Sequence, residues 1–538
     1  MRIKFLGAAS TVTGSFYVID TEKVRFALDC GMFQGAKAIA ERNYGAFSVE
    51  PKSIEFLILS HAHIDHSGLI PKLCKAGFKG PIYCSSVTEE LCQVMLPDSA
   101  HIQEFEVKRK NRKLSRIDKV PLEPIYTIQD ALNSLYQFVS LNYDEVHEVA
   151  EGVELRLRDA GHILGSCITE LWIEEGEDKT KLVYSGDIGH GDQPFVKNPT
   201  VIEEADYLLI ESTYGNRKHQ EMTDRSERLK QIIDDTMNRG GNLIIPSFAV
   251  ERTQDLLYDL SILHSQGRLD PSIAVYIDSP LAIAATEIFE HNQALYDQKT
   301  IDMVKNGFHP LKSPYLKFSR TQEDSMRLNK ITGNAIIISA SGMCEAGRIK
   351  HHLKYNLWRP ECTILFVGYQ AEGTLGRRIL DGEKMVTIHG EQVIVKARIE
   401  NIQAYSAHAD QTALMDWLGN FSSKLKTVFI VHGEEKAQKV FAELIENELH
   451  IPTDIPTWLE EVALKQIEVV QPIQIISGTQ EAKLPSHDWS EALAAEEIYL
   501  RVRGKLNQLF EARYDNAQYE KLIEELKELE YQLNNSYS

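Results

Sequence analysis

The segment LSHAHIDHSGL, residues 59–69, concentrates side chains that bind metal ions. Three histidines and one aspartate fall within six positions, directly after a hydrophobic run: His61, His63, Asp65 and His66. Imidazole nitrogens and carboxylate oxygens are ligands that zinc and similar divalent ions prefer. A buried loop would otherwise have to satisfy each of these polar atoms with protein partners. The HxHxDH spacing therefore predicts a metal site and not a set of structural histidines.

Further ligand-type residues stand at the ends of other hydrophobic runs. They are Asp29 in FALDCG, His162 in RDAGHILG, Asp187 in VYSGDIG, Glu211 in LLIEST, His408 in YSAHAD and His432 in FIVHGEE. Taken singly, each fits an ordinary cap or turn residue, because Asp and Ser beside Gly are common in turns. Their joint occurrence favours one shared site at the strand ends, where functional side chains commonly gather.

The runs that carry these residues indicate how the chain is organised. About the first 200 residues alternate short strand-like runs, such as VRFALDCG and IEFLILSH, with loops. From 209 to 392 the pattern changes to strand-then-helix units, such as NAIIISASGMCEAGRIKHHL, which are typical of parallel βα folds. The first style then returns. We therefore predict an α/β protein in which residues 1–208 and 393–470 form one domain and residues 209–392 are an insertion.

Residues 485–538 predict a helical C-terminal tail. Hydrophobic residues recur there at alternating spacings of three and four, which indicates two amphipathic helices. Each run covers about two heptads, short of a convincing coiled coil. Packing on the body of the protein and formation of a homodimer both fit this pattern.

The composition is that of a globular enzyme. Of the 538 residues, 43% are hydrophobic and 25% are charged, and no apolar run has the length of a membrane span. The N-terminus predicts strands and no secretion signal, so we expect a cytoplasmic protein without a membrane partner. The net charge of −20 argues against global attraction to nucleic acid. VKRKNRKLSRIDK, residues 107–119, is locally basic, and it is either a phosphate-facing patch or a solvated loop.

Ten motifs occur in a characteristic order. They are LDCG, SHAHIDHSG, DAGHILGS, SGDIG, ESTYG, PSFAVERTQ, DSPLA, GYQAEGTLGR, SAHAD and VHGE. With them, residues 1 to about 465 resemble the metallo-β-lactamase superfamily, and in particular its β-CASP branch of nucleic-acid-processing enzymes. HxHxDH alone would indicate only the superfamily, whereas ESTYG, SAHAD and VHGE together indicate the branch. The resemblance implies an αββα sandwich interrupted by a β-CASP α/β domain.

The resemblance also implies a cofactor, two zinc ions (Zn2+). Two sets of ligands would hold one ion each, and one carboxylate would bridge the ions. The implied ligands are His61, His63 and His162 for one ion, Asp65, His66 and His432 for the other, and Asp187 as the bridge. Asp29 would orient a ligand from behind, which fixes the geometry of an imidazole.

Catalysis in this family needs a proton donor besides the metals. By resemblance, His408 would be the general acid and Glu211 its orienting partner, while Asp65 and Asp187 act through the metals. DNA-directed members of the branch tend to have an apolar residue at the position of His432. This chain therefore resembles the RNA-directed group.

The inserted domain is expected to hold the substrate. Strand-to-helix turns offer backbone amides to phosphate, although close packing or capping explains their glycines equally well. The candidates are Ser247 and Arg252 in PSFAVERTQ, and Ser341, Gly342 and Arg348 in SASGMCEAGR. His351 and His352 receive no assignment, because they fit a groove or a helix face.

Together these features predict a zinc-dependent ribonuclease that hydrolyses single-stranded RNA by a two-metal mechanism, in endonucleolytic or 5′-exonucleolytic mode. One alternative is a small-molecule hydrolase of the thioesterase or lactamase type, but a small substrate needs no second domain. The other alternative is a non-catalytic RNA-processing subunit. All ligand positions are filled in this chain, which argues against a degenerate site.

Overall fold

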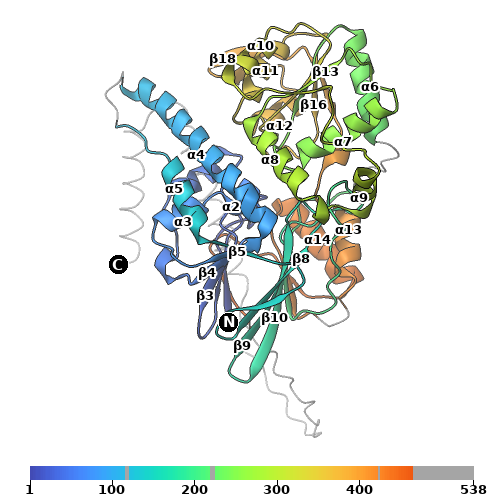
Figure 1. Cartoon of the computed structure of the whole chain (residues 1–538). Helices are drawn as coiled ribbons and strands as arrows, with labels where there is room; N and C mark the ends of the chain where they lie inside the picture. Colours follow the sequence, from blue (N-terminus) through green and yellow to red (C-terminus); the bar gives the residue numbers. More distant parts are fainter. Residues whose placement is uncertain (116–119, 219–224, 422–424, 465–538) are drawn as a thin grey trace, which may run out of the picture. The chain divides into compact units, whose positions relative to one another are not determined.

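The computed structural model in Figure 1 describes residues 1–115, 120–218, 225–421 and 425–464. Two sheets packed face to face and a third, separate sheet organise this part of the chain. The predicted helical tail (485–538), with the dimer that it suggested, lies outside the described residues. So do residues 465–470 of the predicted returning domain and residues 116–119 of the basic run.

Among the described residues, the first sheet has seven strands in the order β22-β1-β2-β3-β4-β5-β6. The part from β1 to β3 is antiparallel, and the part from β3 to β6 is parallel. β22 comes from the returning segment and pairs with β1. The strands are β1 (Arg2–Phe5), β2 (Tyr17–Asp20), β3 (Arg25–Leu28), β4 (Phe56–Ile58), β5 (Ile82–Ser85), β6 (Phe138–Leu141) and β22 (Glu461–Ala463).

The second sheet has the order β21-β20-β11-β10-β9-β8-β7 within the described ranges. The strands from β7 to β10 are antiparallel, and β10, β11, β20 and β21 are parallel. The strands are β7 (Val146–Ala150), β8 (Val153–Asp159), β9 (Cys167–Glu175), β10 (Asp178–Tyr184), β11 (Tyr207–Ile210), β20 (Thr427–Ile430) and β21 (Thr453–Asp454). Because β20 and β21 follow the insertion, the sheet is completed only when the chain returns.

The inner faces of the two sheets form one buried core. The ring centroids of Phe5 and Phe429 lie 5.5 Å apart, as do those of Tyr17 and Tyr184, so each pair joins the two sheets. Burying one such aromatic side chain stabilises the fold by roughly 1.5–3 kcal/mol. The alternation in VELRLRD of β8 follows from this packing, because every second side chain faces the core.

Helices cover the outer faces of both sheets. On the first sheet lie α3 (Ile70–Lys75), α4 (Ser86–Leu114) and α5 (Ile128–Ser134). On the second sheet lie α13 (Gln411–Leu418) and α14 (Glu435–Glu448). The layers are therefore helix, sheet, sheet, helix, which confirms the predicted αββα fold class. No helix of the described ranges combines the length and the apolarity that a membrane crossing needs.

The inserted segment has its own sheet, with the parallel order β14-β13-β15-β12-β16-β19 in the described residues. Helices on both faces bury runs such as AIIIS of β15 completely, so these strands are hydrophobic throughout. The strands are β12 (Leu243–Pro246), β13 (Ala274–Ile277), β14 (Leu316–Phe318), β15 (Ala335–Ser339), β16 (Thr363–Phe366) and β19 (Arg398–Asn401). Through β19, the sheet extends past residue 392, where we predicted the insertion to end.

The helices of the inserted segment follow its strands, as the strand-then-helix pattern predicts. They are α6 (Arg225–Asn238), α7 (Arg252–Ser265), α8 (Pro280–His291), α9 (Gln298–Lys305), α10 (Gln322–Leu328), α11 (Ile349–Asn356) and α12 (Leu375–Leu380). A small hairpin of β17 (Met385–Ile388) and β18 (Glu391–Ile394) packs against α11 and α12. Figure 1 shows these elements as one α/β unit, in green and yellow.

Candidate metal centre and active site

Six strands of the sandwich end beside one another, and a predicted site residue follows each of them. The pairs are β3 with Asp29, β4 with His61, β8 with His162, β10 with Asp187, β11 with Glu211 and β20 with His432. β3 and β4 are parallel neighbours, as are β10, β11 and β20, so their carboxyl ends lie at the same edges. Ligands bind at such edges in parallel sheets. The short helix α2 (Ile64–Ser67) adds Asp65 and His66.

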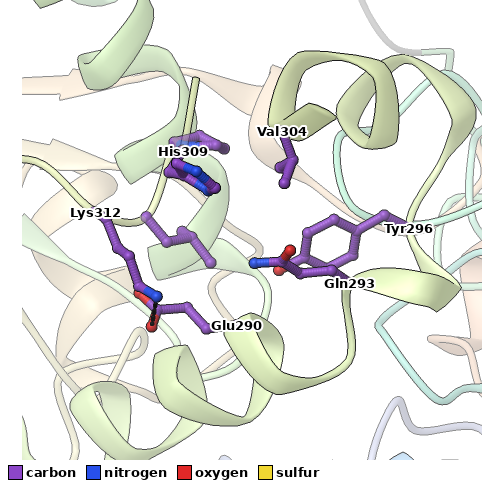
Figure 2. A pocket seen from close by; sticks show the side chains of 8 residues that line it. Glu290, Gln293, Tyr296, Val304, His309 and Lys312 are labelled. Carbon is purple, nitrogen blue, oxygen red and sulfur yellow. Dashed lines mark ion pairs between the residues drawn. The ribbon is translucent and has the colours of Figure 1, made fainter. Parts of the chain in front are cut away.

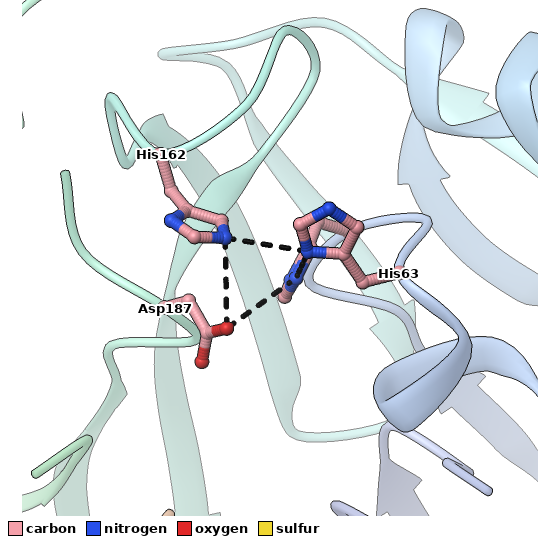
Figure 3. Close-up of side chains that lie close together, drawn as sticks. His63, His162 and Asp187 are labelled. Atoms are coloured by element: carbon pink, nitrogen blue, oxygen red, sulfur yellow. Dashed lines mark hydrogen bonds and ion pairs between the residues drawn. The ribbon is translucent and has the colours of Figure 1, made fainter. Parts of the chain in front are cut away.

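Figure 3 shows the first group of ligand-type side chains, which contains His61, His63, His162 and Asp187. One atom of each lies within 4.8 Å of the others. His63 Nδ1 is 3.1 Å from His61 Nε2 and 3.3 Å from His162 Nε2. Asp187 Oδ2 lies 3.6 Å from the Nε2 atoms of His61 and His162. Three imidazole nitrogens and a carboxylate oxygen thus point at one spot.

The second group adjoins the first and contains Asp65, His66 and His432. The Nε2 atoms of His66 and His432 are 3.2 Å apart, and Asp65 Oδ2 is 3.6 Å from His432 Nε2. Asp187 Oδ1 lies 3.3 Å from His66 Nε2. Asp187 therefore presents Oδ2 to the first group and Oδ1 to the second, the arrangement expected of a bridging carboxylate.

The protonation of the first group suits a divalent cation, whereas in the second group the carboxylates of Asp187 and Asp29 raise the pKa of His66 against the effect of burial. Burial lowers the pKa of His63 to about 4 and the pKa values of His61 and His162 well below their usual range. These imidazoles are therefore neutral near pH 7 and offer lone pairs. Burial alone would raise the pKa of Asp187, but the surrounding imidazoles, His432 foremost, hold it well below its usual range.

One buried oxygen atom also indicates a cation site, independently of any pKa. Asp187 Oδ1 accepts no hydrogen bond from the described residues, although its side chain is only 2% exposed. A buried carboxylate oxygen without a donor is costly unless a cation neutralises it. Imidazoles and carboxylates that converge in this way are the donor set that zinc prefers. The residues present therefore fit a metal ion in each group.

Asp29 stands behind the second group and is completely buried. Its Oδ2 is 2.7 Å from His66 Nδ1, the nitrogen that faces away from the other ligands. The same carboxylate accepts hydrogen bonds from Tyr184 Oη at 2.6 Å and from the backbone amide of Ser60 at 2.7 Å. These bonds fix the orientation of the His66 ring. The sequence pattern singled out neither Ser60 nor Tyr184, since both belong to hydrophobic strand ends.

Glu211 and His408 form a pair at the edge of the first group. The Nδ1 atom of His408 is 3.1 Å from Glu211 Oε2 and 3.8 Å from Asp187 Oδ2. Glu211 is fully buried and also accepts a hydrogen bond from the Ile188 amide at 2.7 Å. Burial alone would lower the pKa of His408, but the carboxylates of Glu211 and Asp187 raise it to about 9. His408 is therefore protonated near pH 7 and suited to donate a proton.

Known protein families match three successive parts of the chain. The metallo-β-lactamase superfamily matches residues 10–201, and the Beta-Casp domain matches residues 253–379. A domain described as a Zn-dependent metallo-hydrolase RNA specificity domain matches residues 392–456. Ribonuclease TTHA0252 of Thermus thermophilus is 33% identical over 445 residues, which cover 83% of this chain and 96% of the relative. The chain belongs to the β-CASP family of the metallo-β-lactamase superfamily. The family predicted from its motifs is thereby confirmed.

Two further relatives are similar over most of their length. The RNase J-like protein of Methanocaldococcus jannaschii is 30% identical over 457 residues, which cover 84% of this chain and 97% of the relative. Transcription termination factor FttA of Methanosarcina mazei is 29% identical over 478 residues, covering 86% of this chain and 72% of the relative. The similarity thus spans both the sandwich and the β-CASP domain.

The predicted substrate residues of the β-CASP domain fall into two places. Three of them lie near Phe248, whose ring centroid is 6.3 Å from that of His63: Gly342 packs on the ring, Ser247 donates to the Phe248 carbonyl, and Arg252 borders Gly368 together with the ring. A Cβ on Gly342 would come within 2.7 Å of the Phe248 ring, so this close packing requires glycine. Sequence reasoning missed Phe248, because an apolar residue between Ser247 and a helix carries no chemical signal.

Arg252 and Arg348 have different surroundings. The guanidinium of Arg252 bonds to Asp255 at 2.9 Å, while its buried Nε has no hydrogen-bond partner among the described residues. Arg348 donates to Asp278 at 2.7 Å and to a backbone carbonyl at 2.8 Å, within the β-CASP domain. Ser341, near the start of the same loop, bonds to the backbone of Ala346. Contact of these residues with substrate stays a prediction.

Glu251 is a second residue that sequence reasoning missed. Its Oε2 accepts a hydrogen bond from the Leu164 amide at 3.1 Å, which joins the β-CASP domain to the loop that carries His162. Its backbone has a φ of 65°, in the region that favours glycine. This strain indicates that the surrounding structure holds Glu251 in place. The motif PSFAVERTQ contained the residue but gave no reason to separate it from Arg252.

Figure 2 shows a small hollow elsewhere in the β-CASP domain, between the end of α8 and α9. Its lining contains Tyr296, His309 and an ion pair between Lys312 and Glu290 at 3.3 Å. None of the predicted site residues lines it. The hollow therefore has no part in the candidate active site.

Proposed function

We propose that this β-CASP protein is a zinc-dependent ribonuclease that hydrolyses phosphodiester bonds of single-stranded RNA with two metal ions. The observation that carries the proposal is the pair of adjoining ligand groups with Asp187 between them. RNA is the expected substrate because two relatives are named as a ribonuclease and an RNase J-like protein, and because an RNA specificity domain matches residues 392–456.

His61, His63 and His162 would hold one ion, and Asp65, His66 and His432 the other, with Asp187 shared. When bound, divalent ions stabilise negative charge on phosphoryl oxygens and make water acidic enough to ionise near neutral pH. Asp29 would keep His66 oriented through its hydrogen bond to Nδ1. Five of the seven ligands are buried and His63 and Asp65 are partly exposed, so the protein brings prearranged donors to a site that stays open on one side.

His408 would supply the proton that the leaving group requires. Hydrolysis adds water across the P–O bond, so that one product keeps the phosphate and the departing oxygen becomes a hydroxyl. Glu211 accepts the Nδ1–H of His408 and fixes the ring, and the proton on the opposite nitrogen, Nε2, would pass to the departing oxygen. The raised pKa keeps the ring protonated until that step.

Elemental analysis of the purified protein tests the metal part of this proposal. We expect about two zinc ions per chain, because each of the two adjoining ligand groups offers three side chains besides the shared Asp187. One ion or none after supplementation with zinc would rule out a dinuclear site.

A cleavage assay on matched single-stranded RNA and DNA tests the substrate. RNA should be cut much faster, and the rate should fall steeply with salt as phosphate contacts are screened. Equal rates on both polymers would contradict the choice of RNA. Rapid hydrolysis of a small thioester or lactam instead would favour the small-molecule alternative, which the β-CASP domain beside the ligand groups argues against.

A further inference from the structure

Two features that the catalytic site does not use meet in the folded chain. The basic run begins at the C-terminal end of α4, and the histidine pair of KHHLKY lies on α11. Arg109 Nη1 of α4 donates to His389 Nδ1 at 3.1 Å, across 280 residues of sequence. The ring of His389 lies on that of His351, with centroids 4.6 Å apart. α4 of the sandwich is thus joined to the β-CASP domain at this point.

The side of α4 that carries Arg109 also carries exposed aromatic and cationic groups. Phe105, Lys108, Arg109 and Arg112 follow the spacing i, i+3, i+4, i+7, which places them on one face of the helix. Phe105 is 62% exposed. Lys108 and Arg112 are exposed, and neither has an ion pair with another described residue.

The two histidines supply neutral polar rings to this surface. Burial and neighbouring positive charges lower the pKa of His389 to about 4, so its Nδ1 can accept the Arg109 hydrogen bond. The guanidinium of Arg109 also bonds to Glu106 at 2.6 Å, which offsets its charge. The uncompensated positive charge of the surface therefore belongs to Lys108 and Arg112.

We infer that this surface, the α4–α11 patch, binds the single-stranded RNA beyond the bond that is cut. The patch consists of Phe105, Lys108, Arg109, Arg112, His351 and His389. Exposed rings stack on bases of any sequence, and adjacent cations follow the phosphates, which is the usual composition of a single-strand binding site. The inference rests on the proposed function and extends it, because the site would hold a long RNA more tightly than a short one.

Charge and position both favour RNA over a protein segment. The chain carries a net charge of −20, but here two exposed cations without an ion pair among the described residues stand on the same helix face as the exposed ring of Phe105, and this combination suits a polyanion whose bases can stack. The patch is also connected through the chain to the neighbourhood of the metal ligands. Phe248 lies beside His63 and packs on Gly342. The loop that carries Gly342 leads through Arg348 into α11, which carries His351.

Anisotropy measurements with His408→Ala as the background test the patch, using RNAs of about 20 and about four nucleotides. Charge reversal by Lys108→Glu with Arg112→Glu should weaken binding of the long RNA by roughly tenfold or more, and much less for the short one. The slope of log affinity against log salt should shrink by about 0.7 for each cation lost. The matched control is Lys299→Glu with Lys305→Glu, two exposed lysines of α9, and it should leave the ratio of long to short affinity unchanged.

The aromatic part has a different signature. Phe105→Ala should weaken the long RNA roughly fivefold or more without changing the salt slope, because stacking releases no counterions, and Phe105→Tyr should restore binding. Tyr136→Ala is the control, since Tyr136 is 89% exposed outside the patch.

Each outcome supports or overturns the inference. If the otherwise unchanged chain cuts RNA but the patch variants bind both RNAs as before, the patch is wrong and the proposed function stands. An equal loss for both RNAs places the effect at the active site or in the fold and also overturns the patch. Failure of the parent chain to bind RNA at all would overturn both the proposed function and the patch.

Discussion

Two buried polar clusters of this protein are built in opposite ways. In the metal centre, nitrogens of His61, His63 and His162 face one another at 3.1–3.3 Å. In the β-CASP domain, by contrast, the buried carboxylate of Asp278 is surrounded by donors. Its Oδ1 accepts from Arg348 at 2.7 Å, and its Oδ2 from the Ser325 hydroxyl at 2.6 Å, with His352 Nε2 also at 2.6 Å.

The difference distinguishes a ligand-binding site, the metal centre, from a structural cluster, that of Asp278. The Asp278 cluster has its positive and negative partners within the protein, and its hydrogen bonds hold the pKa of Asp278 below its usual value against the effect of burial. The metal centre has acceptors without donors, so it needs cations from outside. For Arg348, binding of substrate would require its guanidinium to leave Asp278. Richness in histidine alone therefore does not identify a site, whereas several ligand-type atoms that converge on one spot around an unmatched carboxylate oxygen do.

The largest effect is expected when the carboxylate of Asp187 is removed. Asp187→Ala removes the carboxylate that, among the described residues, faces both ligand groups, so zinc content should fall from about two ions to one or none and RNA cleavage to the background rate. Metal analysis and single-turnover cleavage measure both effects. The control is Asp178→Ala at the exposed start of β10. An Asp187→Ala chain with two bound zinc ions would contradict the bridging role.

Substitutions of His408 and His432 should separate proton donation from zinc binding within the candidate active site. His408→Ala should keep both zinc ions and RNA affinity while slowing single-turnover cleavage by roughly 10²–10⁴, because it removes a proton donor and no ligand. His432→Ala should instead lose zinc, since its Nε2 lies 3.2 Å from that of His66. Loss of zinc in the His408→Ala chain, or cleavage at the parent rate, would refute the general-acid assignment.

Asp278→Ala tests the cluster of the β-CASP domain, where we expect a loss of stability and no loss of zinc. It leaves the buried ring of His352 and the partly buried guanidinium of Arg348 without their shared acceptor, which should destabilise the β-CASP domain by about 3 kcal/mol. Zinc content per folded chain should stay at two. Urea unfolding with parallel metal analysis measures the two quantities, and Asp278→Asn is the milder variant if the alanine chain does not fold. Loss of zinc with unchanged stability would show that Asp278 supports metal binding and not the stability of the β-CASP domain.

The smallest effect on zinc binding is expected from Asp29, which lies behind the ligand His66. Asp29→Asn keeps the shape of the side chain but weakens its bond to His66 Nδ1, so zinc affinity should fall by roughly 10–100-fold. Competition with a chromophoric chelator measures this affinity. Tyr184→Phe removes one hydrogen bond to the same carboxylate and should cost less. An unchanged affinity in both variants would show that Asp29 serves only the fold.

Local sequence was sufficient for the strand runs and for the metal motif. His61, His63, Asp65 and His66 lie within six positions, so one strand end and one helical turn bring them together whatever the rest of the chain does. The β-CASP strands were recognisable for a similar reason. Burial on both faces makes them continuously hydrophobic, and this is visible in AIIIS without knowledge of their neighbours.

Only the tertiary structure decided which distant residues meet. His432 lies 3.2 Å from His66 although 366 residues separate them, and Arg109 reaches His389 across 280. From the residues alone His66 and His432 were separate candidates, Arg109 was part of a basic run, and His389 carried no prediction; the family resemblance supplied the grouping of the ligands but not the patch. Periodicity reports which face of a strand or helix is buried, whereas strand order and domain packing result from burial summed over the whole chain. Contacts between strand ends and between domains follow from that sum, and no short stretch of sequence encodes them.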